Sequence, residues 1–368
     1  MTRREGPPDE AARDLLRHHG DTTPRALRAL GVDPSQVLDL GVNISPFGPS
    51  PGVLAAVRAA DVRAYPDRGA TQAREALGAS LGRPADEVLL GNGAAELIWS
   101  AVRALVPDGA CLLVLGPTFS EAHAAAHACG RRVVEVRARE EDLFEPPLDA
   151  WVTALARERP ALVYVCHPNN PTGRALDFLS LTGLVADHPG TTFLVDQAFL
   201  SLSERHAESA HRLPPNALVV RSLTKDHALA GLRVAYALGA PALLARVAAQ
   251  SAPWSVSSLA LAAAIATTAP EAEAHLTIVR ERWLAQRREL EGLLTQAGLA
   301  HVPSLTVFGL VRVPHADDVR TQLVQRHGFL VRSCTSFGLP GYIRVRASDQ
   351  NARFVAALTR VLTAPPSR

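Results

Sequence analysis

Residues 161–173 read ALVYVCHPNNPTG, a short apolar run that ends in a polar loop fixed by two prolines and a glycine. Similar compact β-rich runs occur at 111–115, 132–136, 192–195, 217–222 and 234–238. Helical patterns are found at 71–81, 94–105 and 120–128. Strands that are apolar throughout are covered on both faces, and strands that alternate with helices form parallel sheets. The sequence therefore predicts an α/β fold with a mainly parallel central sheet and helices on both faces.

The pattern changes after residue 239. A long amphipathic helix is expected over 271–297, followed by strand-like pieces at 305–313 and 342–346 and a helix at 351–361. These elements predict a smaller α+β domain at the C-terminus. We expect an N-terminal arm, 1–46, that packs on the small domain, a large domain, 47–245, and a small domain, 246–368, that includes an interdomain helix.

The composition excludes several classes of protein. There are 38 basic and 36 acidic side chains, so the net charge of +2 gives no support for nucleic-acid binding. No apolar run approaches the ~20 residues needed to span a bilayer. The four cysteines lack any zinc-type spacing, so no metal site is expected and the cysteines indicate a reducing compartment. We expect a cytoplasmic protein with no nucleic-acid or membrane partner.

One basic residue differs from all the others. Of the 38 basic side chains, 37 are Arg and one is Lys, at Lys225. Arginine replaces lysine on a surface, but it cannot supply a deprotonatable amine. Either this lysine survived by chance, or it is required for amine chemistry such as a Schiff base.

Ligands of open α/β sheets bind beyond the carboxyl ends of the strands, so the polar residues after each run are the candidates for chemistry. Asn170 precedes Pro171 and is either a turn residue or a rigidly held amide. Asp196 ends a buried run, where a carboxylate needs a cation. It is either a cap or salt-bridge residue, or the partner of a protonated ring nitrogen.

Other groups in the large domain suit a phosphorylated, flat ligand. Residues 91–96, GNGAAE, open a helix and fit a simple helix cap and a phosphate cradle equally well. Ser222 and Arg233 could hold a phosphate by charge-assisted hydrogen bonds. Phe119 could stack on a ring, although taken by itself a phenylalanine here is better interpreted as a core residue.

In the small domain, Arg344 and Arg346 lie on one face of the same predicted strand. One of them could bind a substrate carboxylate, or both could be solvated. The combined set supplies every group that pyridoxal phosphate needs, namely an imine-forming lysine, a phosphate cup, a stacking ring, an acid for the ring nitrogen and a donor for the ring oxygen.

On these motifs the sequence resembles the fold-type I pyridoxal-phosphate enzymes of the class I/II aminotransferase group. The motifs are HPNNPTG (167–173), Asp196, SLTK (222–225) and GLR (231–233), and the resemblance covers nearly the whole chain. It implies that Lys225 forms the covalent imine with the cofactor, that Asp196 pairs with the ring nitrogen and that Asn170 bonds the ring oxygen.

The resemblance also implies the rest of the cofactor site. Phe119 would stack on the ring. The phosphate would be surrounded by Gly93, Ala94, Ala95, Ser222, Thr224 and Arg233. Tyr65 matches a tyrosine that, in the family, reaches the phosphate of the neighbouring subunit, which implies a homodimer with shared active sites.

The N-terminal stretch is similar to the threonine-phosphate decarboxylases of cobalamin biosynthesis and, more distantly, to the histidinol-phosphate aminotransferases. The matching segments are HHGD (18–21) and VLDLGVNISP (37–46). By this resemblance Asn43 lies by the substrate carboxylate and His18 near the substrate phosphate. Phe199 favours a decarboxylase, since many aminotransferases of the group have Tyr there.

The sequence departs from the family pattern at three places. Gln197 stands where Glu is usual, and Ala95 stands where a polar residue often follows the glycine. The family shows two arginines four residues apart near Arg344, whereas here Arg344 and Arg346 are two apart. Either could bind the substrate carboxylate, with Arg344 favoured by the preceding Ile.

We therefore expect a pyridoxal-phosphate enzyme that acts at the α-carbon of a phosphorylated amino acid. The leading expectation is a lyase, the decarboxylase of L-threonine O-3-phosphate. The alternative is an aminotransferase, either of histidinol-phosphate type or for a specialised biosynthetic pathway. A catalytically silent pyridoxal-phosphate-binding protein is a third, weaker alternative.

Overall fold

The computed structural model describes residues 24–364. The chain forms two compact units, one from Ile44 to Leu284 and the other from the segment up to Asn43 together with the segment from Ala285 onward. The boundary at 284 lies within one long helix, α11 (Pro270–Gln296). None of the helices in residues 24–364 is both long and apolar enough to cross a membrane. A cytoplasmic location stays a prediction.

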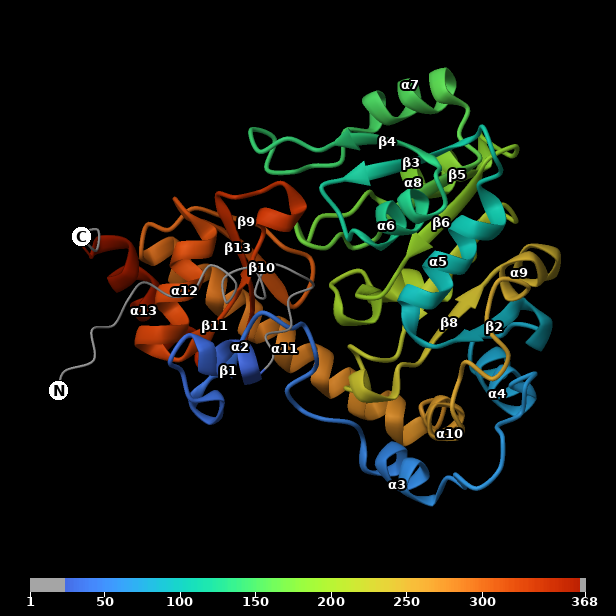
Figure 1. The fold of residues 1–368 in the computed structure, drawn as a ribbon, viewed down its shortest axis with the longest axis horizontal. Coiled ribbons are helices and arrows are strands. Elements are labelled where there is room, and N and C mark those ends of the chain that lie inside the picture. Colours follow the sequence, from blue (N-terminus) through green and yellow to red (C-terminus); the bar gives the residue numbers. More distant parts are fainter. Residues whose placement is uncertain (1–23, 365–368) are drawn as a thin grey trace. The chain divides into compact units, whose positions relative to one another are not determined.

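The larger unit is built on a seven-stranded sheet (Figure 1). In spatial order its strands are β2 (Val88–Gly91), β8 (Ala235–Leu238), β7 (Ala217–Ser222), β6 (Thr192–Asp196), β5 (Leu162–Cys166), β3 (Cys111–Gly116) and β4 (Arg132–Arg137). The five strands from β7 to β4 run parallel, and β8 runs antiparallel to both of its neighbours. The mainly parallel sheet predicted from the sequence is confirmed.

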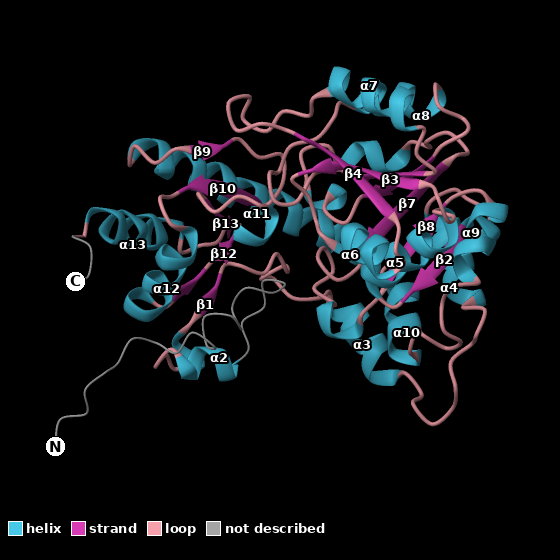
Figure 2. Cartoon of the chain, turned by 45° about the horizontal axis from the view of Figure 1, so that its top comes forward, coloured by secondary structure: helices cyan, strands magenta, loops and turns pink. Residues whose placement is uncertain are grey.

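Helices cover both faces of this sheet (Figures 1 and 2). One face packs against α5 (Gly93–Leu105), α6 (Glu121–Ala128) and α9 (Pro241–Ala248). The other packs against the N-terminal part of α11 and against α3 (Pro51–Ala59), α4 (Thr71–Ser80), α7 (Leu148–Glu158), α8 (Phe178–Ala186) and α10 (Ser258–Ala266).

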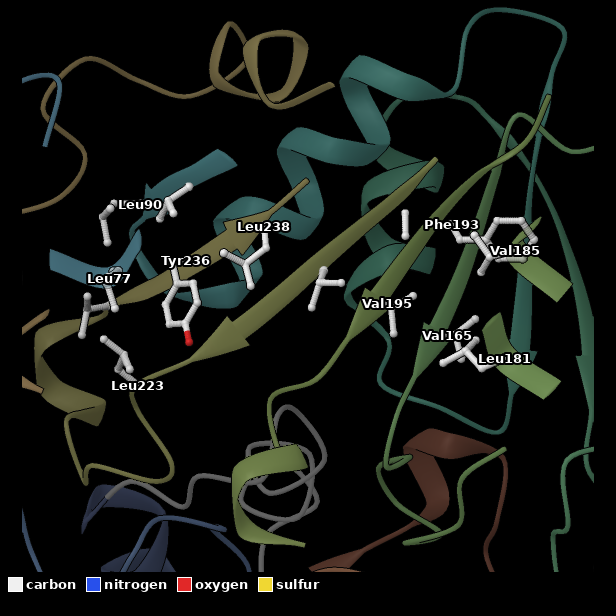
Figure 3. Close-up of a cluster of buried hydrophobic side chains, with 14 of the residues drawn as sticks. Leu77, Leu90, Val165, Leu181, Val185, Phe193, Val195, Leu223, Tyr236 and Leu238 are labelled. Carbon is white, nitrogen blue, oxygen red and sulfur yellow. The ribbon is translucent and has the colours of Figure 1, made fainter. Parts of the chain in front are cut away.

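The side chains of each strand point alternately to the two faces of the sheet, so the buried residues form two separate layers of hydrophobic core. In β5, Val163 and Val165 enter the cluster that contains Phe193, Val195 and Tyr236, which is drawn in Figure 3. The even-numbered positions of β5 face the opposite layer, under α5 and α6. Because successive side chains of a strand point to opposite faces, each strand presents its odd and even residues to different helices. The same alternation applies to the polar residues at the ends of the strands, so neighbouring polar residues point to opposite faces of the sheet.

The smaller unit contains a four-stranded antiparallel sheet and a two-stranded parallel pair. The sheet is ordered β12 (Arg332–Ser333), β13 (Tyr342–Arg346), β10 (Phe308–Arg312) and β9 (His301–Val302). The pair joins β1 (Leu38–Asp39) to β11 (Phe329–Leu330). The helices are α2 (Pro24–Ala29), the C-terminal part of α11, α12 (Ala316–His327) and α13 (Asn351–Thr363). A smaller α+β domain was the expectation for this part of the chain.

Candidate active site

The candidate cofactor residues of the larger unit follow neighbouring parallel strands. Cys166, the last residue of β5, lies in register with Asp196, the last residue of β6. Asp196 in turn lies opposite Val220 of β7, two residues before Ser222. The polar loop after β5, the carboxylate of Asp196 and the segment 222–225 therefore meet at one edge of the sheet. This is the edge at which ligands of such sheets bind.

Asp196 is buried, with 3% of its surface exposed. Its Oδ1 accepts a hydrogen bond from the backbone N–H of Ala198 at 2.9 Å, and its Oδ2 accepts one from the hydroxyl of Tyr164 at 2.9 Å. Burial raises the pKa of Asp196, and both hydrogen bonds and the positive charge of Lys225 act in the opposite direction. The carboxylate of Asp196 and the amine of Lys225 thus interact electrostatically.

The segment that bears Lys225 is fixed by its own hydroxyls and by a distant part of the larger unit. The side-chain oxygens of Ser222 and Thr224 lie 2.7 Å apart, and the N–H of Thr224 donates to Ser222 Oγ. The carbonyl of Lys225 accepts a hydrogen bond from the N–H of Ser45 at 3.1 Å. Ser222 and Thr224 are buried and Lys225 is half-buried. The lysine is therefore held at its backbone.

A cradle suited to a phosphate lies at the start of α5. Gly93 has φ +79°, and a Cβ at this position would lie 2.5 Å from Nη2 of Arg233. The guanidinium thus rests against a backbone that has no room for a side chain. Ala94 and Ala95 complete the first turn of this helix. Free N–H groups at a helix N-terminus together with an arginine make an anion site, so these residues fit the phosphate of the cofactor.

Two residues not singled out from the sequence connect the loops that bear Phe119 and Asn170. Thr118 Oγ1 donates to Asn169 Oδ1 at 2.7 Å, and Asn169 Nδ2 donates to the carbonyl of Pro117 at 2.8 Å. Asn170 itself is 8% exposed, and the half-buried Phe119 packs against the core under α5. The high density of turn residues in 167–173 indicated a rigid loop, but the sequence did not indicate which loop it would bind.

The departure at Gln197 has a clear structural setting. Its side chain belongs to the other face of the sheet, where Gln197 Oε1 accepts a hydrogen bond from Nε of Arg221 at 3.2 Å. Nη2 of Arg221 donates to the carbonyl of Ser209. The side chain of Gln197 therefore binds an arginine on the face of the sheet opposite to Asp196.

Tyr65 lies on the surface of the larger unit, with 82% of its area exposed. Its ring stacks on Trp254, with the ring centroids 5.0 Å apart, and the guanidinium of Arg68 lies over the same tryptophan. Trp254 is itself 48% exposed. The predicted contact of Tyr65 with the phosphate of a neighbouring subunit stays a prediction.

The smaller unit gathers buried arginines on one sheet face. Arg344 and Arg346 are 7% and 6% exposed, so the solvated alternative for them is wrong. Arg332 of β12, which was not singled out from the sequence, lies directly opposite Arg344 of β13. It is buried as well, and its Nη2 donates to Ser336 Oγ at 2.7 Å. We refer to Arg332, Arg344 and Arg346 as the arginine face.

Backbone carbonyls hold two of these guanidinium groups. Nη2 of Arg344 donates to the carbonyl of Gly41 at 2.5 Å, and Nη2 of Arg346 donates to the carbonyl of Asp39 at 2.8 Å. Burial lowers the pKa of Arg344 to about 10. Since a guanidinium with this pKa is still charged at neutral pH, a concentrated positive charge lies within the smaller unit.

Asn43 lies at the end of the segment held by these carbonyls. It is 2% exposed, and neither its Nδ2 nor its Oδ1 has a hydrogen-bond partner among residues 24–364. Buried amide groups without partners are rare and costly, so this side chain is a candidate to bind a ligand. His18, the other substrate residue predicted from the N-terminal stretch, lies outside the described residues.

Comparison with known proteins identifies the family. The model of the aminotransferase class I and II family matches residues 35–358. The chain belongs to this family. Histidinol-phosphate aminotransferase 1 of Cupriavidus pinatubonensis is 32% identical over 355 residues, which cover 93% of each chain. A histidinol-phosphate aminotransferase of Anaeromyxobacter is 34% identical over 341 residues, which cover 90% of this chain and 92% of the other.

Solved structures agree with the family. The histidinol-phosphate aminotransferase of Sinorhizobium meliloti, in complex with pyridoxal-5'-phosphate, has a TM-score of 0.84 and 26% identity and covers 95% of this chain and 96% of its own. The L-threonine-O-3-phosphate decarboxylase of Porphyromonas gingivalis has a TM-score of 0.77, but at 23% identity it shows a shared fold alone.

These findings confirm four expectations from the sequence: the resemblance to the class I and II aminotransferases, the fold, that the protein is an enzyme, and that its cofactor is pyridoxal phosphate. They change the ranking of the two reactions. The curated relatives described above are aminotransferases, so the alternative expectation is better supported than decarboxylation, which was the leading one.

Proposed function

We propose that this enzyme is an aminotransferase of histidinol-phosphate type. The observation that carries the proposal is the identity of more than 30% to histidinol-phosphate aminotransferases over nine tenths of the chain. The arginine face supports it, because the substrate class includes a phosphate or a carboxylate and guanidinium groups bind both. Arg332 and Arg344 are proposed to bind that anion, together with the buried amide of Asn43, which has no hydrogen-bond partner among residues 24–364.

The proposed tasks of the cofactor residues follow from their positions. Pyridoxal phosphate, when bound, supplies an electron sink for the bond broken at the α-carbon. Gly93, Ser222, Thr224 and Arg233 hold its phosphate. Asp196 keeps a proton on the ring nitrogen, since its buried negative charge needs a cation beside it.

Lys225 has two proposed tasks. Its amine would hold the cofactor covalently, and when free it would move the proton at the α-carbon of the substrate. The amine is half-buried and belongs to the only lysine side chain of the sequence. Only the neutral form can accept a proton.

A second candidate, decarboxylation of L-threonine O-3-phosphate, is favoured by one residue. Phe199 is 4% exposed and follows Asp196 by three positions, where many aminotransferases of the group carry a tyrosine. Without that hydroxyl, Asn170 is left as the proposed donor to the ring oxygen. A changed ring environment can alter which bond at the α-carbon is broken.

Product analysis distinguishes the two reactions. The purified holoenzyme is supplied with histidinol phosphate and an α-keto acid, or with L-threonine O-3-phosphate alone. An aminotransferase yields a new amino acid from the keto acid and releases no CO₂. Release of CO₂ with retention of the amine from the threonine compound would establish the second candidate instead.

A homodimer with shared active sites is also proposed, with Tyr65 as the residue donated to the partner. It is supported by the exposure of the stacked pair Tyr65 and Trp254, because a large aromatic surface of this kind is typical of interfaces. Sedimentation across a dilution series measures the oligomeric state of the protein, and a stable monomer would contradict the proposal.

A further inference from the structure

Tyr164 is a buried polar residue that none of the proposed tasks uses. It lies in the middle of β5, with none of its surface exposed, and its hydroxyl donates a hydrogen bond to Oδ2 of Asp196 at 2.9 Å. A buried tyrosine in a strand of Val and Leu needs a partner for its hydroxyl. Here the partner is the carboxylate proposed to hold the cofactor ring.

The sheet explains why the contact forms. Tyr164 lies in register with Leu194 of β6, and Asp196 is two residues further along the same strand. Tyr164 and Leu194 face the layer under α5 and α6, and the even-numbered Asp196 shares that face. A tyrosine is long enough to reach a diagonal neighbour two residues away. A phenylalanine at 164 would fill the same space and leave Oδ2 without this donor.

We propose that Tyr164 is a positioning residue for the cofactor ring, which acts by fixing the orientation and the charge of the Asp196 carboxylate. The Ala198 N–H on Oδ1 and the Tyr164 hydroxyl on Oδ2 hold the two oxygens from opposite ends, so the plane of the carboxylate is set before any ligand arrives. This inference rests on the proposed role of Asp196.

The proton distribution follows from the same contact. Burial favours the neutral acid, and a proton that moved from the ring nitrogen to the carboxylate would remove the positive charge of the ring. Each donor to the carboxylate stabilises its negative form and opposes that transfer. Burial and the charge of Asp196 raise the pKa of Tyr164 well above its usual value, so the hydroxyl keeps its proton and acts as a donor throughout the working pH range.

The test compares two buried tyrosines of one sheet. Tyr164→Phe removes one hydroxyl from the face that carries Asp196. The matched control, Tyr236→Phe, removes a hydroxyl from a tyrosine that is 6% exposed and lies in the cluster on the opposite face (Figure 3). Binding of pyridoxal phosphate to each apoprotein is measured by fluorescence, and the absorbance of the Lys225-bound cofactor is titrated against pH.

We expect Tyr164→Phe to bind the cofactor about tenfold more weakly, the effect of one hydrogen bond to a charged group. The pH midpoint of the absorbance change should move upward, because a ring that has lost its positive charge makes the attached imine more basic. Tyr236→Phe should change neither quantity. Unchanged affinity and an unchanged midpoint in Tyr164→Phe would overturn the inference.

The Asp196→Asn background separates this inference from the proposed role of Asp196. If the hydroxyl acts through the carboxylate, Tyr164→Phe adds little further loss in that background. If Asp196→Asn itself leaves cofactor binding and the pH midpoint unchanged, the role of Asp196 fails. If Asp196→Asn weakens binding and Tyr164→Phe does not, only the positioning role fails.

A further measurement does not depend on how well the Phe variant folds. The chain has four tyrosines, and biosynthetic replacement of tyrosine by 3-fluorotyrosine makes each hydroxyl a stronger donor with almost no change in volume. In the Tyr65→Phe background, which removes the other tyrosine proposed to contact the cofactor, the pH midpoint should move downward, opposite to the effect of Tyr164→Phe. A midpoint that stays the same would contradict the inference.

Discussion

The cofactor site of the larger unit and the arginine face of the smaller unit are built in different ways. Each proposed cofactor residue on β6 or β7 lies at or just beyond the end of its strand, and the strands are parallel neighbours. The arginine face instead depends on antiparallel pairing, which brings Arg332 opposite Arg344 across twelve residues of chain. The first arrangement can be inferred from local sequence, whereas the second needs the register. We therefore expect substitutions in the larger unit to affect the cofactor and those in the smaller unit to affect substrate recognition.

The largest expected effect is at Lys225. Lys225→Ala should lower turnover by about 10³-fold or more, because both the covalent link and the proton-moving amine are lost. Turnover is measured with saturating cofactor, and borohydride reduction followed by mass analysis shows whether the cofactor is fixed at residue 225. Lys225→Arg is the matched control, since it keeps the charge without a deprotonatable amine and should be equally inactive. Normal turnover in either variant would exclude the proposed mechanism.

Asp196→Asn should reduce turnover by about 10²-fold, the usual effect of removing one preorganised electrostatic group. Ala198 and Tyr164 donate to different oxygens of Asp196, and an Asn side chain has only one oxygen to accept these hydrogen bonds. Cofactor affinity should therefore fall as well. Steady-state kinetics and cofactor titration measure the two effects. Activity close to that of the wild type would make Asp196 a structural residue.

The arginine face should affect the substrate and leave the cofactor unaffected. Arg344→Ala should lower kcat/KM by roughly 30-fold, about 2 kcal/mol, because an anion loses a desolvated partner. Arg346→Ala is the comparison that decides which of the two arginines binds the anion. Cofactor affinity serves as the control in both variants. If it falls in parallel with kcat/KM, the two regions are not as separate as proposed.

A smaller effect is expected at the exposed aromatic pair. Tyr65→Phe should weaken cofactor binding about fivefold, the contribution of one hydrogen bond, if the hydroxyl reaches the phosphate of a partner subunit. Trp254→Phe keeps an aromatic ring beneath Tyr65 and is the matched control. Mixing Tyr65→Phe with Lys225→Ala subunits tests sharing directly, because one of the two sites in each hybrid dimer is then intact. No change in cofactor affinity in Tyr65→Phe would argue against a shared site.

The smallest expected effect concerns the pH dependence of stability in the larger unit. Burial lowers the pKa of His123 in α6 below the usual 6.5. The unfolded chain then binds a proton more readily than the folded protein, so this contribution to stability is present above about pH 6.5 and is lost as the pH falls below it. His123→Gln should reduce the acid sensitivity of the unfolding temperature by no more than about 2–4 °C. Thermal unfolding of both proteins between pH 5 and 8 measures it, and parallel curves would refute the prediction.

The fold could be predicted in large part because its signals are local. The apolar runs gave β3 to β8 within about one residue at each end, and the amphipathic pattern gave α11. The strand β2 was missed because its four residues lie directly before the helix motif of 91–96 and were not recognised as a separate element. The antiparallel direction of β8 was missed because the direction depends on how residues 223–234 connect β7 to β8, and not on composition.

The candidate site could be predicted only where chemistry follows a strand directly. Lys225 and Asp196 stand out because charged groups follow apolar runs. Tyr164 could not be recognised, since its role depends on which strand lies beside β5. Arg332 could not be recognised either, because only the register of β12 against β13 brings it opposite Arg344. Contacts of this kind are properties of the sheet and not of any segment.

Gly93 has a consequence for how this sequence can change. Of the 38 basic residues of this chain, 37 are arginine, and the two residues after Gly93 are both alanine. A single-step change of Gly93 to alanine would meet both the positive φ and the nearby Nη2 of Arg233. Position 93 therefore does not accept the alanine that the two following positions carry, and the restriction there is steric. At position 225 the restriction is the chemistry of an amine.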